Sequence, residues 1–256
     1  MGTDIRMERK DAVVELVIDR PTKKNALTAE MYAMMAEVLR DADGDPAVRA
    51  ILIRGTRDTF CAGNDIEDFI KAPPNAEDHP VFRFMHELSH ATKPVVAAVV
   101  GSAIGIGTTM LLHCDLVYVA DNARFSTPFT GLGLCPENAS SYLLPLVAGY
   151  QRAAELLLLG EPFGADRALQ CGFVTQVVPQ QEVVTAARAA AAKLAALPAK
   201  SVRITKALIK RPHLARIEEH IRAEADAFRP MLGEPAAREA FAAFKERRKP
   251  DFSKIA

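Results

Sequence analysis

The chain has 256 residues, with 32 basic and 32 acidic side chains, and hydrophobic residues make up 49% of it. This composition excludes a disordered chain, which needs low hydrophobicity and a high net charge, and it argues against a nucleic-acid binder, which usually carries a basic excess. The length allows one or two domains with a large hydrophobic core.

The N-terminal residues, MGTDIRMERK, are charged and lack the apolar core of a secretory signal. Pro94–Leu112 has no charge and is long enough to span a bilayer, but glycines interrupt it. A strand, a turn and a buried helix fit this stretch better, so we expect no membrane partner. The cysteines lack the spacing of a zinc site or a disulfide framework, which indicates free thiols and a cytoplasmic location: Cys61, Cys114, Cys135 and Cys171.

Strands and helices are expected to alternate in the first half of the chain. Ile5–Glu8 and Val13–Ile18 indicate a hairpin, and Pro21 ends its second strand. Thr28 can cap a helix whose core-facing residues are Met31, Met34, Met35, Val38 and Leu39. The further strands are Val48–Ile53, Val95–Val100 and Asp115–Ala120. This alternation predicts an α/β fold with largely buried strands.

The second half is mostly helical. The first helices expected there are Ala139–Val147, Arg152–Leu159 and Ala165–Gln170, followed by one strand at Phe173–Val178. The rest is helix: Val183–Leu197, then a segment capped by Ser201 that ends at Lys210, and then two more helices punctuated by Pro212, Pro230 and Pro235. We therefore divide the chain into residues 1–197 and a helical region, 198–256. Such a region cannot cover all its apolar faces alone and often docks on a neighbouring subunit.

The first segment with possible chemistry is Phe60–Ile66, with the sequence FCAGNDI. Gly-Asn-Asp is common in turns, so a plain turn is one interpretation. In the other interpretation, Gly63 lets the chain bend so that Asn64 points at a ligand.

The second segment is Gly101–Thr109, with the sequence GSAIGIGTT. A strand, a glycine turn and a helix that starts near Gly105 or Ile106 form the geometry of an anion site, because the first helix amides lack partners. The glycines do not have the spacing of a dinucleotide fingerprint, and no P-loop lysine follows. Close packing of a helix on a sheet is the alternative.

The third segment is Gly131–Ser141, in which Glu137 is the only acidic residue between Asp121 and Glu155. A solvated loop carboxylate, or an acid at a helix N-terminus, is the simple interpretation. A lone carboxylate among apolar residues is also what a general base needs, because desolvation raises its pKa.

Metal and serine-hydrolase chemistry have little support in the sequence. His86 and His90 are one helical turn apart but have no third ligand nearby, so we expect a surface pair and no metal site. Ser140 and Ser141 lack the G-x-S-x-G elbow of serine hydrolases.

In their order and separation, these segments resemble the crotonase superfamily of acyl-CoA enzymes, and the resemblance covers nearly the whole chain. The matching motifs are Arg20–Leu27 (R-P-x-K-x-N-A-L), Phe60–Ile66 (F-C-A-G-x-D-I), Gly101–Asp115, Ala165–Val174 and Phe244–Phe252. The resemblance implies a spiral of ββα units on residues 1–197. It also implies that region 198–256 makes the subunit contacts of a homotrimer or a dimer of trimers.

The resemblance further implies that the backbone amides of Asn64 and Ile106 form an oxyanion hole for the thioester oxygen. A thioester α-proton is removed only when the enolate oxygen is stabilised, and preorganised amides at a helix N-terminus do this. A free charge on Asp65 beside these amides would repel an enolate, so Asp65 is given a structural role in the loop or at the CoA end. The other substrate-binding residues implied are Ala62, Gly63, Ile66 and Gly105, with Lys23, Lys24, Lys206 or Lys210 at the CoA phosphates. Surface lysines are usually just solvated, which is the alternative for all four lysines.

Hydratases of this family use two glutamates, and the matching positions here hold Thr109 and Phe129. Glu137 instead stands where hydratases usually have glycine, an arrangement that resembles the Δ3,Δ2-enoyl-CoA isomerases. The resemblance implies one proton-transferring glutamate and no metal or redox cofactor, with CoA only as part of the substrate. Hydration, another crotonase reaction, and acyl-CoA binding without catalysis stay open as alternatives.

Overall fold

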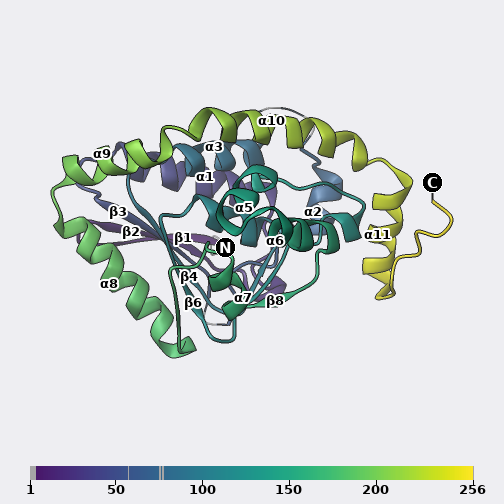
Figure 1. The fold of residues 1–256 in the computed structure, drawn as a ribbon, viewed down its shortest axis with the longest axis horizontal. Helices are drawn as coiled ribbons and strands as arrows, with labels where there is room; N and C mark the ends of the chain where they lie inside the picture. The colour runs from purple at the N-terminus through teal and green to yellow at the C-terminus, as the bar shows by residue number, and fades with distance from the viewer. Residues whose placement is uncertain (1–3, 57, 75, 77, 256) are drawn as a thin grey trace.

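The computed structural model describes residues 4–56, 58–74, 76 and 78–255 (Figure 1). A six-stranded sheet lies at its centre, in the order β1-β2-β3-β4-β6-β9. Its strands are β1 (Ile5–Lys10), β2 (Val13–Ile18), β3 (Ala50–Arg54), β4 (Val95–Val99), β6 (Leu116–Ala120) and β9 (Gln176–Val178). β1 and β2 pair antiparallel, which confirms the predicted hairpin, and the other neighbours pair parallel.

A second sheet consists of three short strands in the order β5-β7-β8. They are β5 (Ser102–Ile104), β7 (Arg124–Ser126) and β8 (Phe163–Gly164), and they are too short to leave an alternating pattern in the sequence. β5 follows β4 and β7 follows β6 along the chain, and helical segments come after each pair. This repeated succession agrees with the expected α/β fold of ββα units.

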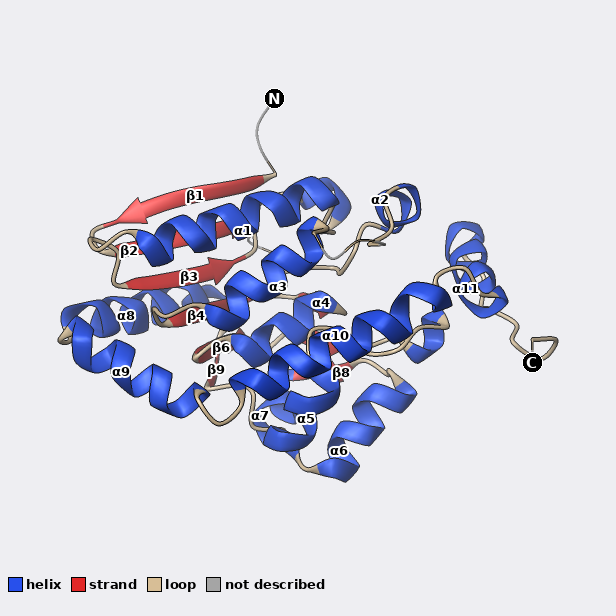
Figure 2. Ribbon diagram, turned by 90° about the horizontal axis from the view of Figure 1, so that it is seen from above, coloured by secondary structure: helices blue, strands red, loops and turns tan. Residues whose placement is uncertain are grey.

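Both faces of the large sheet are covered by helices. Leu52 and Val96 face α8 (Val183–Ala196), whereas Ile51 and Val95 belong to the core shared with α1 (Ala29–Gly44) and α3 (Pro80–His90). This alternation follows from the two-residue period of a strand. Figure 1 shows α1 and α3 above the sheet and α8 below it, and Figure 2 shows the same helices from above.

Helix α1 forms where the sequence predicts it. The Thr28 side chain accepts a hydrogen bond of 3.3 Å from the Met31 amide, so it caps the helix as expected. Met31, Met35 and Leu39 are buried, and Met34 and Val38 lie partly buried against the same core.

The uncharged stretch Pro94–Leu112 is divided among β4, β5, α4 (Ile106–Thr109) and a 3₁₀ turn at Met110–His113. The predicted strand, glycine turn and helix are therefore confirmed, with β5 as an unpredicted addition. None of the described helices combines the length and apolar character needed to cross a membrane.

Some element predictions are wrong in detail. Ser201 lies inside α9 (Ala199–Lys210), which begins after Pro198, so it does not cap that helix. The expected helix Arg152–Leu159 is α6 (Tyr150–Ala154) followed by a π-helix, Glu155–Leu159. Helices α2 (Ile66–Lys71) and α3 were not predicted from the sequence, although α3 has a helical apolar period at Val81, Phe84, Met85 and Leu88.

Region 198–256 is packed against the rest of the molecule. After α9 come α10 (Leu214–Met231) and α11 (Pro235–Glu246), and Figure 1 shows α9 and α10 along one edge with α11 at the far end. Phe228, Ala237 and Phe241 of this region belong to the main hydrophobic core. Two shorter helices precede this region in the sequence, α5 (Ser140–Ala148) and α7 (Ala165–Gln170).

Candidate active site

All three segments singled out in the sequence reach one cavity of about 550 Å³. Nearly every predicted site residue lines it: Lys23, Lys24, Ala62, Gly63, Asn64, Asp65, Ile66, Gly105, Ile106 and Glu137. The fold therefore brings together residues that are more than a hundred positions apart in the chain, such as Lys23 and Glu137.

The loop that carries Asn64 is held by backbone hydrogen bonds on both sides. Leu27 donates its amide to the Gly63 carbonyl over 2.8 Å, and Asp65 donates to the Leu27 carbonyl over 2.8 Å. On the other side Cys61 pairs with β5, because its carbonyl accepts from the Ile104 amide over 2.9 Å. The loop is thereby fixed next to the start of α4.

Glycines allow α4 to approach this loop closely. Gly105 caps α4 at φ 55° and ψ −121°, a conformation that favours glycine. A Cβ atom on Gly107 would lie 2.6 Å from the Cys61 carbonyl oxygen, so a larger residue would push the helix away. Within the described part of the chain, the backbone amides of Asn64 and Ile106 have no hydrogen-bond acceptor. Both are available to a ligand.

The side chain of Asn64, in contrast, is engaged. Its Oδ1 accepts a hydrogen bond from the hydroxyl of Tyr32 on α1. Tyr32 is fully buried, and burial, followed by the nearby Glu137 charge, raises the pKa of its phenol well above the usual range. Tyr32 therefore stays protonated and ties the loop to α1.

Asp65 has the structural partners that the sequence predicts. Its Oδ1 accepts from the amides of Glu67 and Asp68 over 3.1 and 3.2 Å and so caps α2, while Oδ2 pairs with Arg20 over 2.7 Å. Burial opposes ionisation, but the Arg20 guanidinium and the Asp68 amide outweigh it and lower the pKa of Asp65. The carboxylate is thus occupied and ionised at neutral pH.

Glu137 is in the opposite situation. Its side chain is only 9% exposed, and its Oε1 has no hydrogen-bond partner within the described part of the chain. Burial, followed by the charge of Glu224, raises the pKa of Glu137 to about 8. An unpartnered buried carboxyl with a pKa near neutrality can exchange protons with a bound ligand.

The backbone after Glu137 is unusual. Asn138 and Ala139 both lie in the left-handed region, at φ 60° and 55°, which is uncommon for residues other than glycine. The Ser140 hydroxyl donates to the Glu137 carbonyl over 2.6 Å, and His113 Nε2 bonds the Asn138 carbonyl over 2.9 Å. Burial lowers the pKa of His113 to about 4, so the imidazole is neutral and donates from Nε2.

The contribution of α10 and α11 to the site was not predicted from the sequence. Phe228, Phe241 and Phe244 line the cavity, and Glu224 of α10 lies beside Glu137. One signal was present, because Glu224 shares a helical face with the apolar residues Ile217 and Phe228.

The two positions at which hydratases carry glutamates are buried and do not titrate near neutral pH. Thr109 is fully buried on α4, and Phe129 lines the cavity. The structure therefore places no second acid on α4 or at Phe129.

The prediction that Lys206 meets the CoA phosphates is not supported. Lys206 is 6% exposed and does not line the cavity. Its Nζ donates to the Lys93 carbonyl and to Asp115 Oδ2, each over 2.7 Å. Lys210 likewise donates to the Ser89 carbonyl over 2.8 Å, and burial, followed by the charge of Lys206, lowers its pKa to about 8.

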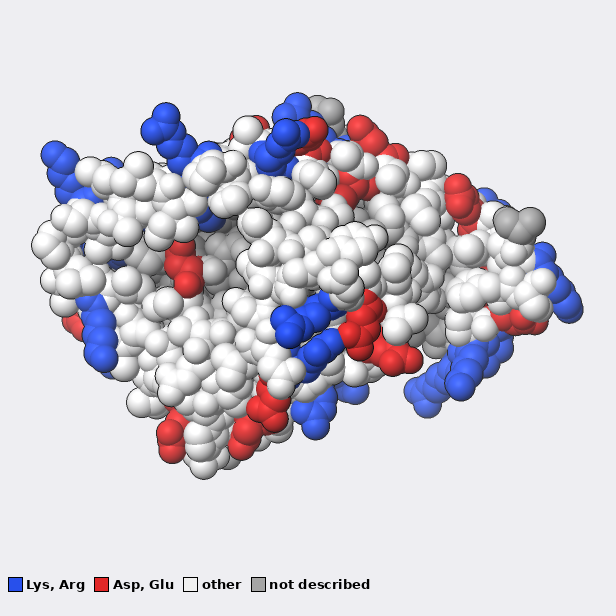
Figure 3. Space-filling model, in the orientation of Figure 1, with Lys and Arg blue, Asp and Glu red and all other residues white. Residues whose placement is uncertain are grey.

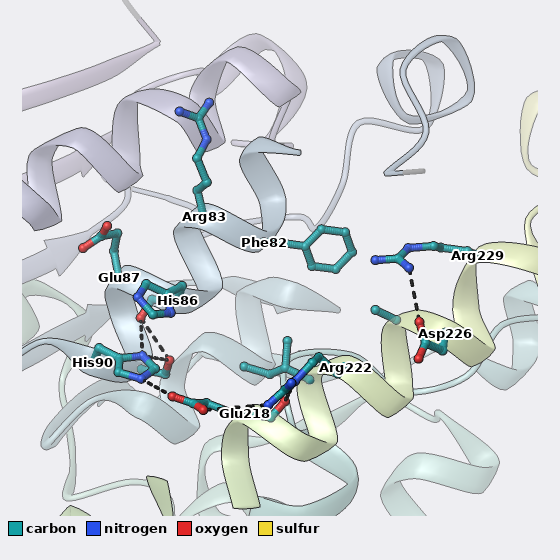
Figure 4. A pocket seen from close by; sticks show the side chains of 12 residues that line it. Phe82, Arg83, His86, Glu87, His90, Glu218, Arg222, Asp226 and Arg229 are labelled. Carbon is teal, nitrogen blue, oxygen red and sulfur yellow. Dashed lines mark hydrogen bonds and ion pairs between the residues drawn. The ribbon is translucent and has the colours of Figure 1, made fainter. Parts of the chain in front are cut away.

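His86 and His90 lie in a separate cavity of about 520 Å³ between α3 and α10 (Figure 4). Their rings stack with centroids 4.1 Å apart, and His90 Nε2 lies 2.7 Å from Glu218 Oε1 on α10. The contact of His90 with Glu218 of α10 was not predicted from the sequence. Over residues 4–56, 58–74, 76 and 78–255, no group of three or more His, Cys, Asp and Glu residues is placed to hold a metal ion.

Comparison with known proteins identifies the family. The model of the family "Enoyl-CoA hydratase/isomerase" matches residues 8–254. The 1,2-epoxyphenylacetyl-CoA isomerase of Escherichia coli (strain K12) is 33% identical over 249 residues, 94% of this chain and 95% of that protein. Enoyl-CoA delta isomerase 2 of Homo sapiens is 35% identical over 213 residues, 79% of this chain but 53% of the human protein, so the match spans about half of that relative.

A solved structure agrees with these matches. Pseudomonas aeruginosa OdaA superposes with a TM-score of 0.93 at 45% identity, and the match covers 95% of this chain and 99% of that one. Family model, full-length relative and fold therefore coincide with the motifs found in the sequence. The chain belongs to the enoyl-CoA hydratase/isomerase family of the crotonase superfamily.

Proposed function

We propose that this protein is a Δ3,Δ2-enoyl-CoA isomerase, which moves a double bond of an acyl-CoA from the 3,4 to the 2,3 position. The observation that carries the proposal is the Glu137 carboxyl, which is buried, has no partner at Oε1 among the described residues and has its pKa raised to about 8. Asn64 and Ile106 line the same cavity, and their backbone amides have no acceptor in the part of the chain that the structure describes. The match to a human enoyl-CoA delta isomerase supports the same reaction.

The proposed reaction needs one base and two hydrogen-bond donors. Glu137 removes a proton from C2, the electrons of the broken C–H bond form a double bond between C1 and C2, and the carbonyl π electrons move onto the thioester oxygen, which gives a dienolate that still has its 3,4 double bond. The amides of Asn64 and Ile106 donate to that oxygen, an interaction of about 3–4 kcal/mol for one such donor in other enzymes. Protonated Glu137 then delivers the proton to C4. When C4 takes up the proton, the carbonyl re-forms and the electrons between C1 and C2 become the 2,3 double bond of the product.

Only protons and a double bond move in this reaction, so it requires no metal or redox cofactor. CoA enters as part of the substrate. Lys23 and Lys24 are exposed at the cavity and supply positive charge for the CoA phosphates. Ala62, Gly63, Ile66 and Gly105 line the same cavity, and the proposal assigns them to the surroundings of the thioester.

A single base favours isomerisation over hydration. Thr109 and Phe129 cannot activate water, and both Glu224 oxygens are occupied by the amides of Ala139 and Ser141. Supplying 3-enoyl-CoA and 2-enoyl-CoA separately and identifying the products tests the proposal. We expect 2-enoyl-CoA from the first substrate. Formation of 3-hydroxyacyl-CoA from the second would assign a hydratase instead, and binding without turnover would assign a non-catalytic acyl-CoA binder.

We expect kcat/KM for 3-enoyl-CoA to rise with pH and to level off above the pKa of Glu137, about 8. The base must be ionised to accept a proton, so kcat/KM falls by about tenfold for each pH unit below that pKa. The measurement is kcat/KM in a constant-ionic-strength buffer series from about pH 6 to about pH 9. A flat profile over this range would contradict Glu137 as the base.

We also propose that the chain forms a homotrimer or a dimer of trimers. Apolar side chains are exposed on α9 and around α5, where Figure 3 shows a broad uncharged area: Ile204, Leu208 and Ile209, and Leu146, Val147 and Tyr150. Burial of such surface between copies is favourable by about 25 cal/mol per Å².

We expect light scattering to give a mass well above 27.8 kDa for the wild-type protein. Replacing Leu208 and Ile209 together by Glu should reduce that mass, because two charges would be buried at the contact. Met7→Glu is the control, since Met7 is similarly exposed but lies on β1. An active wild-type monomer at micromolar concentration would overturn this proposal.

A further inference from the structure

Glu224 is a buried acid of α10 whose carboxylate reaches the backbone that follows Glu137. Its Oε2 accepts a hydrogen bond from the Ala139 amide over 2.6 Å, and its Oε1 accepts from the Ser141 amide over 2.9 Å. Glu224 is 7% exposed, and a small cavity of about 20 Å³ is lined by Glu137, Asn138 and Glu224 together. Both carboxylate oxygens are thus used, and both hold the chain within four residues of the proposed base.

The hydrogen bonds of Glu224 are made at and just after a strained backbone segment, Asn138–Ala139. Asn138 and Ala139 have consecutive positive φ angles of 60° and 55° without a glycine between them. Left-handed conformations of such residues are unfavourable and persist only where surrounding contacts enforce them. The enforcing contacts are Glu224 on the Ala139 amide and His113 on the Asn138 carbonyl.

This turn decides where Glu137 points. Because α5 begins at Ser140, the turn joins the base directly to a helix that is packed against α10. If the turn relaxed, Glu137 would rotate relative to the amides of Asn64 and Ile106, which are held by a different part of the fold.

We propose that Glu224 is a positioning residue, which holds the strained Asn138–Ala139 turn through the amides of Ala139 and Ser141 and so directs Glu137 into the acyl-CoA cavity. The inference rests on the proposed role of Glu137 as the base. Glu224 itself does not line the large cavity and does not touch the substrate in this arrangement.

Glu224 also acts on Glu137 through its charge. After burial, the Glu224 carboxylate is the group that raises the pKa of Glu137. The other titratable groups around the pair are neutral near pH 7 or face elsewhere. Burial raises the pKa of Cys61 to about 12 and of Cys135 to about 11, lowers that of His113 to about 4, and keeps Tyr32 protonated.

The remaining polar neighbours belong to α10. His220 Nδ1 bonds the Ser141 hydroxyl over 3.2 Å, and Arg229 pairs with Asp226 over 3.2 Å while its guanidinium lies over Phe82 (Figure 4). Arg229 lines the small cavity, but its ion pair is with Asp226 and not with Glu137 or Glu224. Among the described residues, Glu224 is the charged group that raises the pKa of Glu137 after burial.

Two substitutions separate the hydrogen bonds of Glu224 from its charge. Glu224→Gln removes the charge and leaves one acceptor for two amides, whereas Glu224→Asp keeps the charge but is one methylene too short to hold both. Glu218→Gln is the matched control, because Glu218 is a carboxylate of the same helix that faces the separate groove in Figure 4. For each protein we would measure kcat for 3-enoyl-CoA. The Glu137 ionisation midpoint would be followed by NMR of protein labelled with ¹³C at the glutamate carboxyls and assigned with Glu137→Gln.

We expect Glu224→Gln to lower kcat by about a hundredfold, as for a misplacement of about 1 Å, and to lower the Glu137 midpoint by about one pH unit or more. Glu224→Asp should lower kcat while the midpoint stays near the wild-type value, and Glu218→Gln should change neither. A wild-type kcat in folded Glu224→Gln, or in Glu224→Asp if the Gln variant does not fold, overturns the inference. Absence of isomerase activity in the wild-type protein overturns the proposed function instead, whereas the NMR midpoint still reports the coupling between the two acids.

Discussion

Glu137→Gln is expected to lower kcat for 3-enoyl-CoA by about a hundred- to ten-thousand-fold, the usual effect of removing a general base. Glutamine preserves the size of the side chain and a hydrogen-bonding end, but it cannot accept the C2 proton. Because the Glu137 carboxyl is buried and its pKa is about 8, the protonated acid predominates at neutral pH, and Gln is a close mimic of it. The substitution should therefore leave the fold intact.

Two further measurements show whether Glu137→Gln affects catalysis alone. Calorimetric affinity for a saturated acyl-CoA should stay within a few-fold of the wild-type value, because Glu137 is assigned to proton transfer and not to CoA binding. The melting temperature at neutral pH should not fall, because Gln replaces a carboxyl that is mostly uncharged there and places no charge beside Glu224. Glu218→Gln, remote from the cavity, is the control for loss of a carboxylate.

Two outcomes would change the assignment. Turnover of Glu137→Gln near the wild-type rate would exclude Glu137 as the base and would leave Asp65 as the next candidate. Asp65 would then have to release its bonds to Arg20 and to the α2 amides, because both of its oxygens are occupied. If turnover and binding fall together, Glu137 shapes the pocket and its catalytic role is unproven.

Asn64→Pro is expected to lower kcat by about a hundred- to a thousandfold, the cost of losing one donor of an oxyanion hole. Proline removes the backbone N–H. The Asn64 amide donates no hydrogen bond within the described part of the chain, so its removal breaks no backbone hydrogen bond of the fold there. Asn64→Ala keeps the amide and should retain substantial activity. Similar kinetics for the two variants would contradict an oxyanion role for this amide.

The structure adds a correction for Asn64→Ala that the sequence could not provide. The Asn64 side chain accepts the Tyr32 hydroxyl, so alanine leaves a buried hydroxyl without a partner, at about 1–3 kcal/mol of stability. The double variant Tyr32→Phe with Asn64→Ala removes both groups and should recover part of the melting temperature. Comparing kcat/KM among the three variants at a temperature well below their melting points separates stability from catalysis.

The family and the fold class could be recognised from the sequence alone, and so could the three segments that line the large cavity. The segments Phe60–Ile66, Gly101–Thr109 and Gly131–Ser141 each carry their local geometry in their own residues. Gly105 allows the turn before α4, and Gly107 allows α4 to approach Cys61 closely. Thr28 caps α1, and the methionines that follow it form the buried face of that helix. Such features depend on backbone torsions and on helical period, which are short-range properties, so they can be recognised without coordinates.

The burial of charged side chains and their pairing across distant elements could not be predicted from the sequence. Lysine is a residue type that usually lies on the surface, yet the packing of α9 buries the Lys206 ammonium against Asp115, which is 91 positions away in the chain. Glu224 and Ala139 are 85 positions apart and meet because α10 crosses α5. The free energy of a charged side chain depends on what surrounds it, through desolvation and the partners within hydrogen-bond reach. Residue type and local pattern do not contain that information, so the sequence could identify Glu137 but not the acid that holds it in place.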